Sequence, residues 1–330
     1  MTDVAAPDLE RTLEQHRSEL TGYCYRMLGS SFEAEDAVQE TLVRAWRGFD
    51  RFEGRSALRS WLYRIATNVC LDMIQGRQRR ALPMDLVSSS SGDSEAGPRL
   101  PESKWIQPIP DGRALQPTED PAEVTESRET IRVAFIAALQ HLPARQRAVL
   151  ILRDVLRWKA SEVAEALETS VAAVNSALQR AHAQLHGKQL TEDTVSNDLT
   201  PDQEKLLERY VDAFWRKDIT TIVSMLTQEA VWEMPPFTGW YRGAENIGEL
   251  IDTQCPGGVN DMPMVATWAN GQPAFGLYMR TRKGDFVPFH LQVLTLDGDR
   301  VSHVGAFFDP RLFETFGLPA RLPGDYVTTG

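Results

Sequence analysis

The chain has 330 residues, with 35 basic and 46 acidic side chains and a formal net charge of −11. This length predicts two or three domains, and the lack of any long apolar run argues against a membrane span. The polar N-terminus lacks the apolar core of a signal peptide, so we expect a cytoplasmic protein, and three widely spaced cysteines predict neither disulfides nor a metal site.

Helices are expected throughout the N-terminal segment 1–82. A helix over 8–29 should pack beside two amphipathic helices within 32–72. A loop rich in Arg, Phe and Gly should join these two helices. Apolar residues recur in both at the 3.6-residue spacing of a buried helix face. The first stripe contains Val38, Leu42, Ala45, Trp46 and Phe49. The second contains Leu58, Trp61, Leu62, Ile65, Val69 and Met73.

The opposite faces of these two helices differ in chemistry. The first is mainly acidic, with Glu33, Glu35, Asp36, Gln39, Glu40, Arg44 and Arg47. The second carries Arg59, Ser60, Tyr63, Arg64, Thr67 and Asn68. Carboxylates on one helix, and Arg, Asn and an aromatic ring on the next, suggest one surface for a protein and another for nucleic acid. From the pattern alone, two solvated bundle helices remain the alternative.

The run EAEDAVQETLVRAW, followed by F-x-G-R-S-A-L-R-S-W-L-Y-R-I-A-T-N, closely resembles region 2 of bacterial sigma factors. The similarity is to the extracytoplasmic-function (ECF) group of the sigma-70 family. It implies that the helix at 36–46 grips the clamp helices of the largest RNA polymerase subunit. The residues implied in this contact are Asp36, Gln39, Glu40 and Arg44.

The same resemblance implies that the loop at 51–58 and the following helix hold the melted promoter −10 element. The residues implied are Phe52, Arg55, Ser56, Arg59, Ser60, Arg64 and Asn68. Contacts with flipped bases around positions 52–56 would offset the unstacking cost of roughly a few kcal/mol. This step requires no cofactor.

Residues 83–122 interrupt the helical pattern with seven prolines and six serines, which predicts a flexible linker. The linker carries a net charge of −4, whereas residues 1–82 are neutral and residues 123–190 carry +2. Because phosphate neutralisation supplies most non-specific DNA affinity, the two helical blocks would bind DNA weakly alone. In the family, an acidic linker threads the RNA-exit path of the polymerase; a plain tether is the alternative.

Residues 139–185 predict a helix-turn-helix, with helices starting after Pro143, near Ser161 and after Thr169-Ser170, where a hydroxyl can cap the last helix. Its buried side should contain Val163, Ala164, Leu167, Val171, Val174, Leu178 and Leu185. The last helix should expose Ala172, Asn175, Ser176, Gln179 and Arg180. In the major groove, Asn and Gln can read adenine, and Arg can read guanine or phosphate. A generic helical hairpin fits the periodicity alone.

This block resembles sigma region 4 through L-x-x-L-P, R-x-V-L-x-L-R, E-V-A-x-x-L and S-V-A-A-V-N-S-A-L-Q-R-A. The resemblance implies that it reads the −35 element and contacts the polymerase flap. The chain departs from the family at two places. Arg157-Trp158-Lys159 replaces a turn in which many members have glycine, and Asn175 and Ala177 stand where basic residues are commoner.

After a second polar break, residues 201–226 predict two helices, followed by five short strands within 230–309. Leu296-Asp297-Gly298-Asp299 is a hairpin signal between two of them. Residues 201–320 resemble the SnoaL-like (cystatin-like) α+β cone shared with ketosteroid isomerases and polyketide cyclases. The candidate pocket residues of this cone are Trp232, Met234, Trp240, Tyr241, Trp268, His290 and Asp309.

The cone leaves three roles open: catalysis with His290 or Asp309 as general base, binding of a small ligand, or packing and docking that regulates the rest of the chain. The combined expectation is a multidomain protein. It has all-α region 2 over 1–82, the flexible linker, all-α region 4 over 123–190 and the α+β domain over 200–320.

The function expected is that of a sigma factor without catalytic or metal-binding residues. Its partners would be core polymerase, promoter DNA and either an anti-sigma factor or a ligand, but no membrane. A polymerase-independent helix-turn-helix regulator and a cyclase- or isomerase-like enzyme fused to DNA-binding helices are the alternatives.

Overall fold

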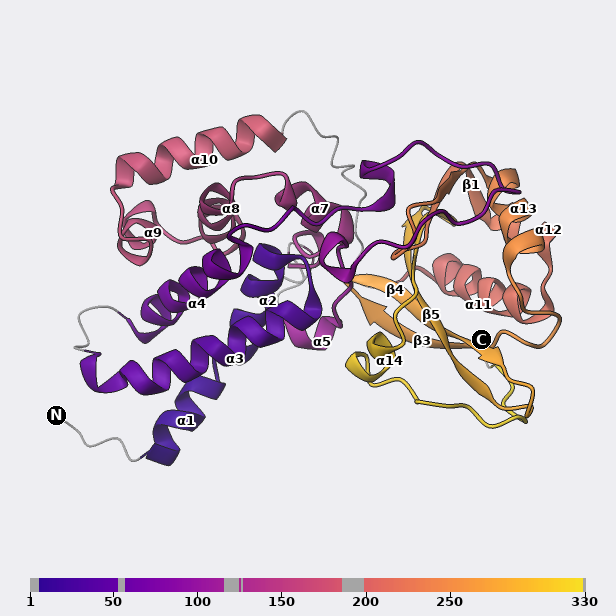
Figure 1. Cartoon of the computed structure of the whole chain (residues 1–330), viewed down its shortest axis with the longest axis horizontal. Helices are drawn as coiled ribbons and strands as arrows, with labels where there is room; N and C mark the ends of the chain where they lie inside the picture. Colours follow the sequence, from indigo (N-terminus) through magenta and orange to yellow (C-terminus); the bar gives the residue numbers. More distant parts are fainter. Residues whose placement is uncertain (1–5, 53–56, 116–124, 126, 186–198, 329–330) are drawn as a thin grey trace. The chain divides into compact units, whose positions relative to one another are not determined.

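The chain folds into two units whose boundaries do not follow sequence order. In the computed structural model, unit 1 comprises Met1–Arg80 and Asp111–Glu192, and unit 2 comprises Ala81–Pro110 and Asp193–Gly330. The residues described are 6–52, 57–115, 125, 127–185 and 199–328. Figure 1 shows the helices of unit 1 in indigo to pink and the sheet of unit 2 in orange to yellow.

Unit 1 is helical over its described residues. Its first part contains α1 (Ala6–Glu14), α2 (Arg17–Leu28), α3 (Ser31–Gly48), the 3-10 turn η1 (Phe49–Arg51) and α4 (Leu58–Ile74). Its second part contains α5 (Asp111–Ala114), α7 (Val133–Gln140), α8 (Ala144–Leu150), the π-helical turn η4 (Ile151–Val155), α9 (Ala160–Ala166) and α10 (Val171–Leu185). The helices predicted within 32–72 and the helix-turn-helix are therefore confirmed.

Local signals explain where two of these helices begin. The Ser30 hydroxyl accepts a hydrogen bond from the Glu33 N–H at the start of α3. The Ser170 hydroxyl accepts one from the Ala173 N–H at 3.1 Å, as the sequence predicted for the start of α10. Each bond satisfies a backbone donor that the first helical turn leaves free.

The buried faces agree with the predicted stripes at their centres and differ at their edges. Val38, Ala45, Leu62 and Val174 are buried. The prediction was wrong for Trp46 and Val171, which are 56% and 44% exposed, because each lies at the edge of its stripe, where the neighbouring helices do not cover it. The half-buried members of the stripes are Phe49, Leu58, Trp61, Ile65, Met73, Leu167, Leu178 and Leu185.

Over its described residues, unit 2 combines four α-helices with one six-stranded sheet. The helices are α11 (Pro201–Arg216), α12 (Ile219–Met225), α13 (Ala244–Gln254) and the short α14 (Arg311–Thr315), which follows the last strand. The strands are β1 (Leu226–Glu233), β2 (Trp240–Arg242), β3 (Met264–Ala269), β4 (Gln272–Arg280), β5 (Phe286–Asp297) and β6 (Arg300–Phe307). The sheet order is β2-β1-β6-β5-β4-β3, and only β1 and β6 pair in parallel.

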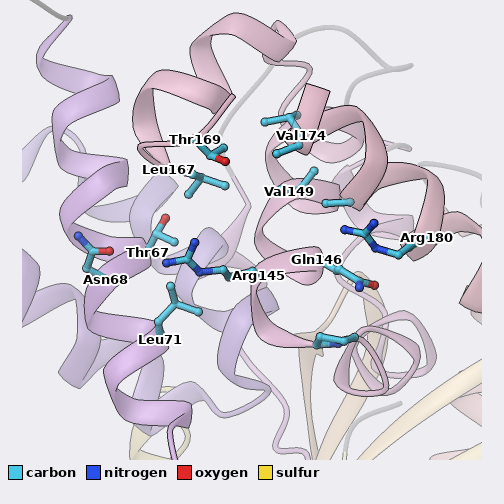
Figure 2. Close-up of a pocket in the computed structure, with 13 residues that line it drawn as sticks. Thr67, Asn68, Leu71, Arg145, Gln146, Val149, Leu167, Thr169, Val174 and Arg180 are labelled. Carbon is cyan, nitrogen blue, oxygen red and sulfur yellow. The ribbon is translucent and has the colours of Figure 1, made fainter. Parts of the chain in front are cut away.

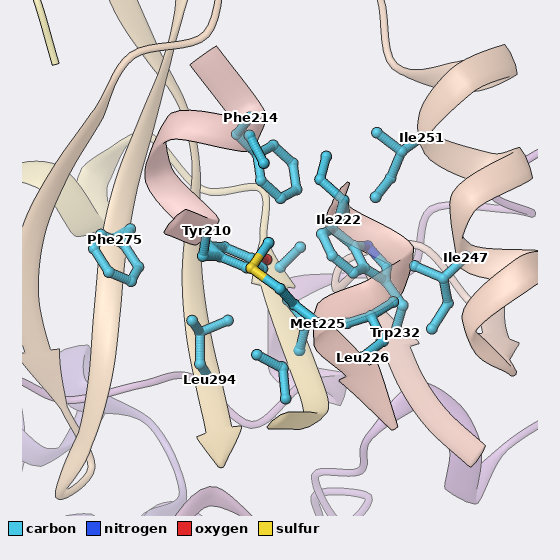
Figure 3. Packing of buried hydrophobic residues seen from close by; sticks show 14 of the residues in the cluster. Tyr210, Phe214, Ile222, Met225, Leu226, Trp232, Ile247, Ile251, Phe275 and Leu294 are labelled. Atoms are coloured by element: carbon cyan, nitrogen blue, oxygen red, sulfur yellow. The ribbon is translucent and has the colours of Figure 1, made fainter. Parts of the chain in front are cut away.

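The α+β fold class is confirmed, and so is the hairpin at Asp297 and Arg300, which pair across a turn with Gly298 in a left-handed conformation. One hydrophobic cluster lies between the helices and the sheet. Figure 3 shows Tyr210 and Phe214 of α11 facing Trp232 of β1, Phe275 of β4 and other members of this cluster. Burial of these side chains supplies most of the stabilisation of the unit.

Residues 81–110 differ from the flexible linker expected over 83–122, because they pack on unit 2; we call them the strap. The Ser90 N–H donates to the Trp240 carbonyl at 2.7 Å, and the Gly239 N–H donates to the Ala96 carbonyl at 2.7 Å. The Cβ of any other residue at 239 would lie 2.5 Å from that carbonyl oxygen, so glycine permits the close approach.

The remainder of the strap also has partners in unit 2. The Leu100 N–H donates to the Pro236 carbonyl at 2.9 Å, and the Ile109 N–H donates to Asn270 Oδ1 at 3.0 Å. The strap includes two 3-10 turns, η2 (Pro83–Asp85) and η3 (Glu102–Lys104). Trp105, Ile106 and Ile109 are fully or almost fully buried. The backbone of this proline-rich segment is thus satisfied partly by its own short turns and partly by residues far away in the sequence.

Candidate nucleic-acid interface

The outward face of α3 combines charge with two exposed apolar side chains. The four residues implied in polymerase binding, Asp36, Gln39, Glu40 and Arg44, are all exposed. Arg44 pairs with Glu40 at 2.7 Å. Val43 (41% exposed) lies three positions after Glu40, and Trp46 lies seven positions after Gln39. Both therefore belong to the same side of the helix. The sequence prediction missed both because it assigned Trp46 to the core and did not assign Val43.

The next long helix, α4, presents the side chains expected to hold the −10 element. Asn68 and Arg59 are exposed, and Ser60 and Arg64 are half-buried. The prediction that Tyr63 and Thr67 lie on the exposed face was wrong, since both are buried. The Tyr23 ring lies 5.1 Å from the Tyr63 ring, and the Tyr23 and Thr67 hydroxyls lie 2.6 Å apart.

The loop before α4 is only partly within the described residues. Arg55 and Ser56 lie outside them. Phe52 is half-buried, and its ring lies tilted with its centre 4.9 Å from that of the Trp61 ring, which in turn lies 6.4 Å from the Phe49 ring. An aromatic platform of this kind at the entrance to α4 can accept an unstacked base on its face.

The helix α10 exposes every residue that the sequence assigned to DNA contact. These residues are Ala172, Asn175, Ser176, Gln179 and Arg180. Val174 and Ala181 on its other side are buried. The small side chains of this face allow a close approach to a groove, and the amides and guanidinium provide the donors and acceptors that base edges require.

A cavity of about 270 Å³ lies within unit 1, between α4 and the helices α8 and α10. Figure 2 shows Thr67, Asn68 and Leu71 of α4 on one side, and Arg145 and Arg180 among the side chains on the other. The side chains that line this cavity include no carboxylate. One residue of each predicted DNA-binding set therefore lines this cavity, Asn68 for the −10 element and Arg180 for the −35 element.

Two buried arginines join the two helical regions of unit 1. Arg147 of α8 donates to the Met27 carbonyl and, at 2.6 Å, to Gln140 Oε1. Arg26 of α2 donates to the Thr130 carbonyl at 3.1 Å and to the Thr130 hydroxyl at 3.0 Å. Burial lowers the pKa of each guanidinium to about 10, so both stay charged at neutral pH.

In unit 2, the candidate pocket residues are distributed over several environments. Trp232 and Met234 belong to the hydrophobic cluster, and Trp268 is 37% exposed on the edge strand β3. Trp240 Nε1 donates to the Val87 carbonyl at 2.8 Å, and the Tyr241 hydroxyl donates to the Ser94 carbonyl at 2.9 Å. The last two therefore hold the strap.

The two titratable candidates are separately engaged. His290 is 4% exposed, its Nε2 lies 2.9 Å from Gln292 Nε2, and burial lowers its pKa to about 3. Asp309 forms an ion pair with Arg311 at 2.6 Å and lines a second cavity of about 380 Å³ between the strap and the sheet. No other candidate pocket residue lines either of these two cavities.

None of the described helices is sufficiently long and apolar to cross a membrane. Two family models match the chain: "Sigma-70 region 2" over residues 12–80 and "Sigma-70, region 4" over residues 132–185. Each range falls within one of the two helical parts of unit 1.

The comparison with known proteins extends beyond these regions. The ECF RNA polymerase sigma factor SigG of Mycobacterium tuberculosis is 50% identical over 318 residues, which cover 96% of this chain and 85% of SigG. SigW of Bacillus subtilis is 30% identical over 175 residues, 53% of this chain and 84% of SigW. The crystal structure of M. tuberculosis SigJ matches with a TM-score of 0.57 at 19% identity, covering 94% of this chain and 99% of SigJ.

The SigJ match supports the fold, and the SigG match spans both units. Together with the two matched regions, in the expected order, these similarities establish the family. The chain belongs to the ECF RNA polymerase sigma factors of the sigma-70 family, which direct transcription initiation at promoters.

Proposed function

We propose that the exposed face of α3 is the surface with which this sigma factor binds core RNA polymerase, at the clamp helices of the largest subunit. The observation that carries the proposal is the exposure of Trp46 and Val43 beside Asp36, Glu40 and Arg44. A large aromatic residue surrounded by charged ones is typical of the centre of a protein interface.

The test is a double charge reversal, Asp36→Arg with Glu40→Arg. We expect core binding to weaken by about tenfold or more, because attractive contacts become repulsive. Binding is measured by co-sedimentation of the full chain with purified core polymerase. Glu204→Arg with Glu208→Arg on α11 is the matched control, since both residues are exposed in unit 2. Unchanged binding of the α3 variant would contradict the assignment.

The second part of the proposal concerns promoter DNA. Arg59, Ser60, Arg64 and Asn68 of α4 hold the melted −10 element, with Phe52 of the preceding loop as a stacking platform. The exposed face of α10 reads the −35 element, and region 4 also contacts the polymerase flap. Supporting this division, an aromatic platform that suits single-stranded bases lies beside α4, whereas α10 presents small side chains, amides and a guanidinium that suit the groove of a duplex.

The third part assigns unit 2 a regulatory role in cis. The strap is the segment of chain between regions 2 and 4, and it is held by backbone and side-chain hydrogen bonds to unit 2. Region 2 and region 4 can engage separate promoter elements only if the connecting segment permits their separation. A domain that retains the strap therefore restricts the distance that the two regions can span.

We propose no catalytic role for unit 2. The imidazole of His290 is buried and has no carboxylate partner among the described residues, and Asp309 is neutralised by Arg311. A general base needs access to substrate and a matched pKa. An anti-sigma factor and a small ligand at the strap-side cavity are further partners that binding experiments can test.

A further inference from the structure

His290 lies at the end of a chain of three buried polar side chains in unit 2. The Tyr210 hydroxyl donates to Gln292 Oε1 at 2.8 Å, and Gln292 Nε2 lies 2.9 Å from His290 Nε2. All three side chains are 4% exposed or less. A polar chain in a core is favourable only where each donor meets an acceptor, so the direction of each bond matters.

This chain determines which nitrogen of the imidazole carries the proton. An amide nitrogen can only donate, so His290 Nε2 must accept from Gln292. Burial lowers the pKa of His290 to about 3, so the ring is neutral at physiological pH and its single proton lies on Nδ1. His290 is therefore a hydrogen-bond donor at Nδ1 rather than a base, which agrees with the lack of a catalytic role proposed for unit 2.

The Nδ1 donor is left over when the chain is complete. This atom is buried and has no hydrogen-bond partner among the described residues. An unpaired buried donor destabilises a folded protein, and native proteins seldom retain one unless a water molecule or a ligand accepts from it. Tyr210 and Gln292 thus direct one N–H toward an acceptor that the described chain does not supply.

The surroundings of His290 are aromatic and only partly covered. The Phe308 and Phe289 rings lie 4.6 Å and 5.0 Å from the imidazole, and Phe237 packs edge-on against Phe308 at 5.6 Å. All three phenylalanines are half-buried, and we call them the aromatic cap. Phe308 also lines the strap-side cavity of about 380 Å³, so this one side chain borders both the cavity and the imidazole.

The charged side chains of the strap-side cavity balance one another. Two carboxylates and two arginines line it, so it has no net charge. Asp309 and Glu102 both pair with Arg311, at 2.6 Å and 2.5 Å, and Arg99 is exposed to solvent. A charged ligand would lose hydration without gaining an ion pair in return, which favours an uncharged ligand. The volume is within the range typical of small-molecule sites.

We propose that the strap-side cavity binds a small uncharged molecule that combines a ring with a carbonyl oxygen. The ring packs on the aromatic cap, and the oxygen accepts the hydrogen bond from His290 Nδ1. A change of side-chain rotamer at Phe308 connects the cavity to the imidazole. The inference rests on the ligand that the proposed function allows at this cavity, and it names the chemical class of that ligand.

The test compares two probes of similar shape, acetophenone, which has a carbonyl oxygen, and ethylbenzene, which has none. Affinities are measured by ligand-observed NMR titration of the full chain. We expect His290→Phe to lower the affinity for acetophenone relative to that for ethylbenzene by about fivefold or more, because phenylalanine keeps a ring but removes the N–H. Comparing this ratio between variants cancels the different hydration of the two probes.

Matched variants control for position and for folding. His182→Phe on α10, where the side chain is 47% exposed, should leave the ratio unchanged. Leu100→Trp places a larger side chain in the strap-side cavity and should weaken binding of both probes by about tenfold or more. If His290→Phe does not fold, the ¹⁵N shift of His290 Nδ1 in the unmodified protein replaces it, since acetophenone should move this shift and ethylbenzene should not.

Three results would overturn the proposal. Binding of neither probe would refute the site, and full binding of both to Leu100→Trp would place it elsewhere. An unchanged affinity ratio in His290→Phe, or an unchanged Nδ1 shift with acetophenone, would mean that water alone accepts from this nitrogen.

Failure of the proposed function would appear differently. Removal of residues 200–330 tests, without any ligand, whether unit 2 regulates transcription. If this removal leaves run-off transcription unchanged while the probes bind as expected, the regulatory role fails and the ligand site stands. If transcription changes but the affinity ratio does not depend on His290, only the ligand class is refuted.

Discussion

Glu233 contacts both the strap and a neighbouring strand of the sheet in unit 2. Its carboxylate is 1% exposed, lies 2.8 Å from His303 Nε2 and accepts the Met84 N–H of the strap at 2.8 Å. A carboxylate buried at the end of β1 is tolerated because both oxygens have partners. The same residue therefore connects the sheet to the strap.

We expect Glu233→Ala to lower the free energy of unfolding of the protein by about 2–3 kcal/mol, because it leaves a partly buried backbone N–H and His303 without an acceptor. Glu229→Ala on the same strand is the control. Its carboxylate is 73% exposed and pairs with Arg242, so its loss should cost less than about 1 kcal/mol. Urea denaturation measures both, and equal losses would contradict the role of Glu233.

His290 gives unit 2 a predictable dependence on pH. Burial lowers the pKa of its imidazole from 6.5 to about 3. Between these values the unfolded chain binds a proton that the folded chain excludes, so stability falls as the pH falls through this window. At pH 5 the loss from this group is about 2 kcal/mol relative to pH 7.5.

The measurement is the urea midpoint at pH 7.5 and pH 5 for the protein with His290 and with His290→Met. The methionine variant should lose stability at pH 7.5 because Gln292 loses a partner, yet its profile should be flatter between the two pH values. An equally steep profile would assign the acid sensitivity to other groups.

In the helix α10, the residues proposed to read DNA can be changed without altering the buried side of the helix. Its outward residues make no contribution to the buried side formed by Val174 and Ala181. We expect Asn175→Ala, Gln179→Ala and Arg180→Ala, combined, to lower promoter-specific run-off transcription by about tenfold or more, since each base contact contributes roughly 1–3 kcal/mol. Core binding should be unchanged.

The control for this variant is Gln184→Ala, which removes an exposed amide near the end of the same helix. Transcription that stays at the unmodified level in the triple variant would contradict −35 reading by α10. A loss of core binding in that variant would instead assign this face to the polymerase.

Element-level predictions succeeded where the signal is local. The 3.6-residue stripe, the Ser170 cap and the Leu296-Asp297-Gly298-Asp299 turn each depend on neighbours in sequence, and the structure has all three. The side-chain assignments failed where tertiary packing decides. Tyr63 looked solvent-exposed because its partners, Tyr23 and Trp158, lie far from it in the sequence.

The strap shows that amino-acid composition alone does not predict whether a segment is ordered in the folded molecule. Its prolines and serines exclude a regular helix, which the sequence indicated correctly, but they do not exclude order. Its hydrogen-bond partners Trp240, Gly239 and Asn270 lie far downstream, beyond the whole of region 4. The spacing of Trp105, Ile106 and Ile109 was the available signal, since large apolar residues gathered in so short a stretch seldom remain in water.

At the scale of the chain, removal of residues 200–330 tests whether unit 2 regulates transcription through the strap. The deletion removes all the residues of 200–330 that form hydrogen bonds with the strap. Trp105, Ile106 and Ile109 are then no longer buried. We expect trypsin to cleave the strap at Arg99 and Lys104 much faster in the truncated protein, while core binding through α3 persists. Run-off transcription should change because the segment between regions 2 and 4 is no longer retained.

A milder variant distinguishes release of the strap from loss of the domain. Asn246 of α13 donates to the Ser90 carbonyl at 2.9 Å and accepts the Gly92 N–H, so Asn246→Ala removes two of the hydrogen bonds that hold the strap and leaves the sheet intact. Asp252→Ala, an exposed position on the same helix, is the control. If Asn246→Ala shifts transcription in the same direction as the deletion, strap retention is the regulated step. If only the deletion has an effect, unit 2 acts through another surface, and if neither does, it has no role in cis.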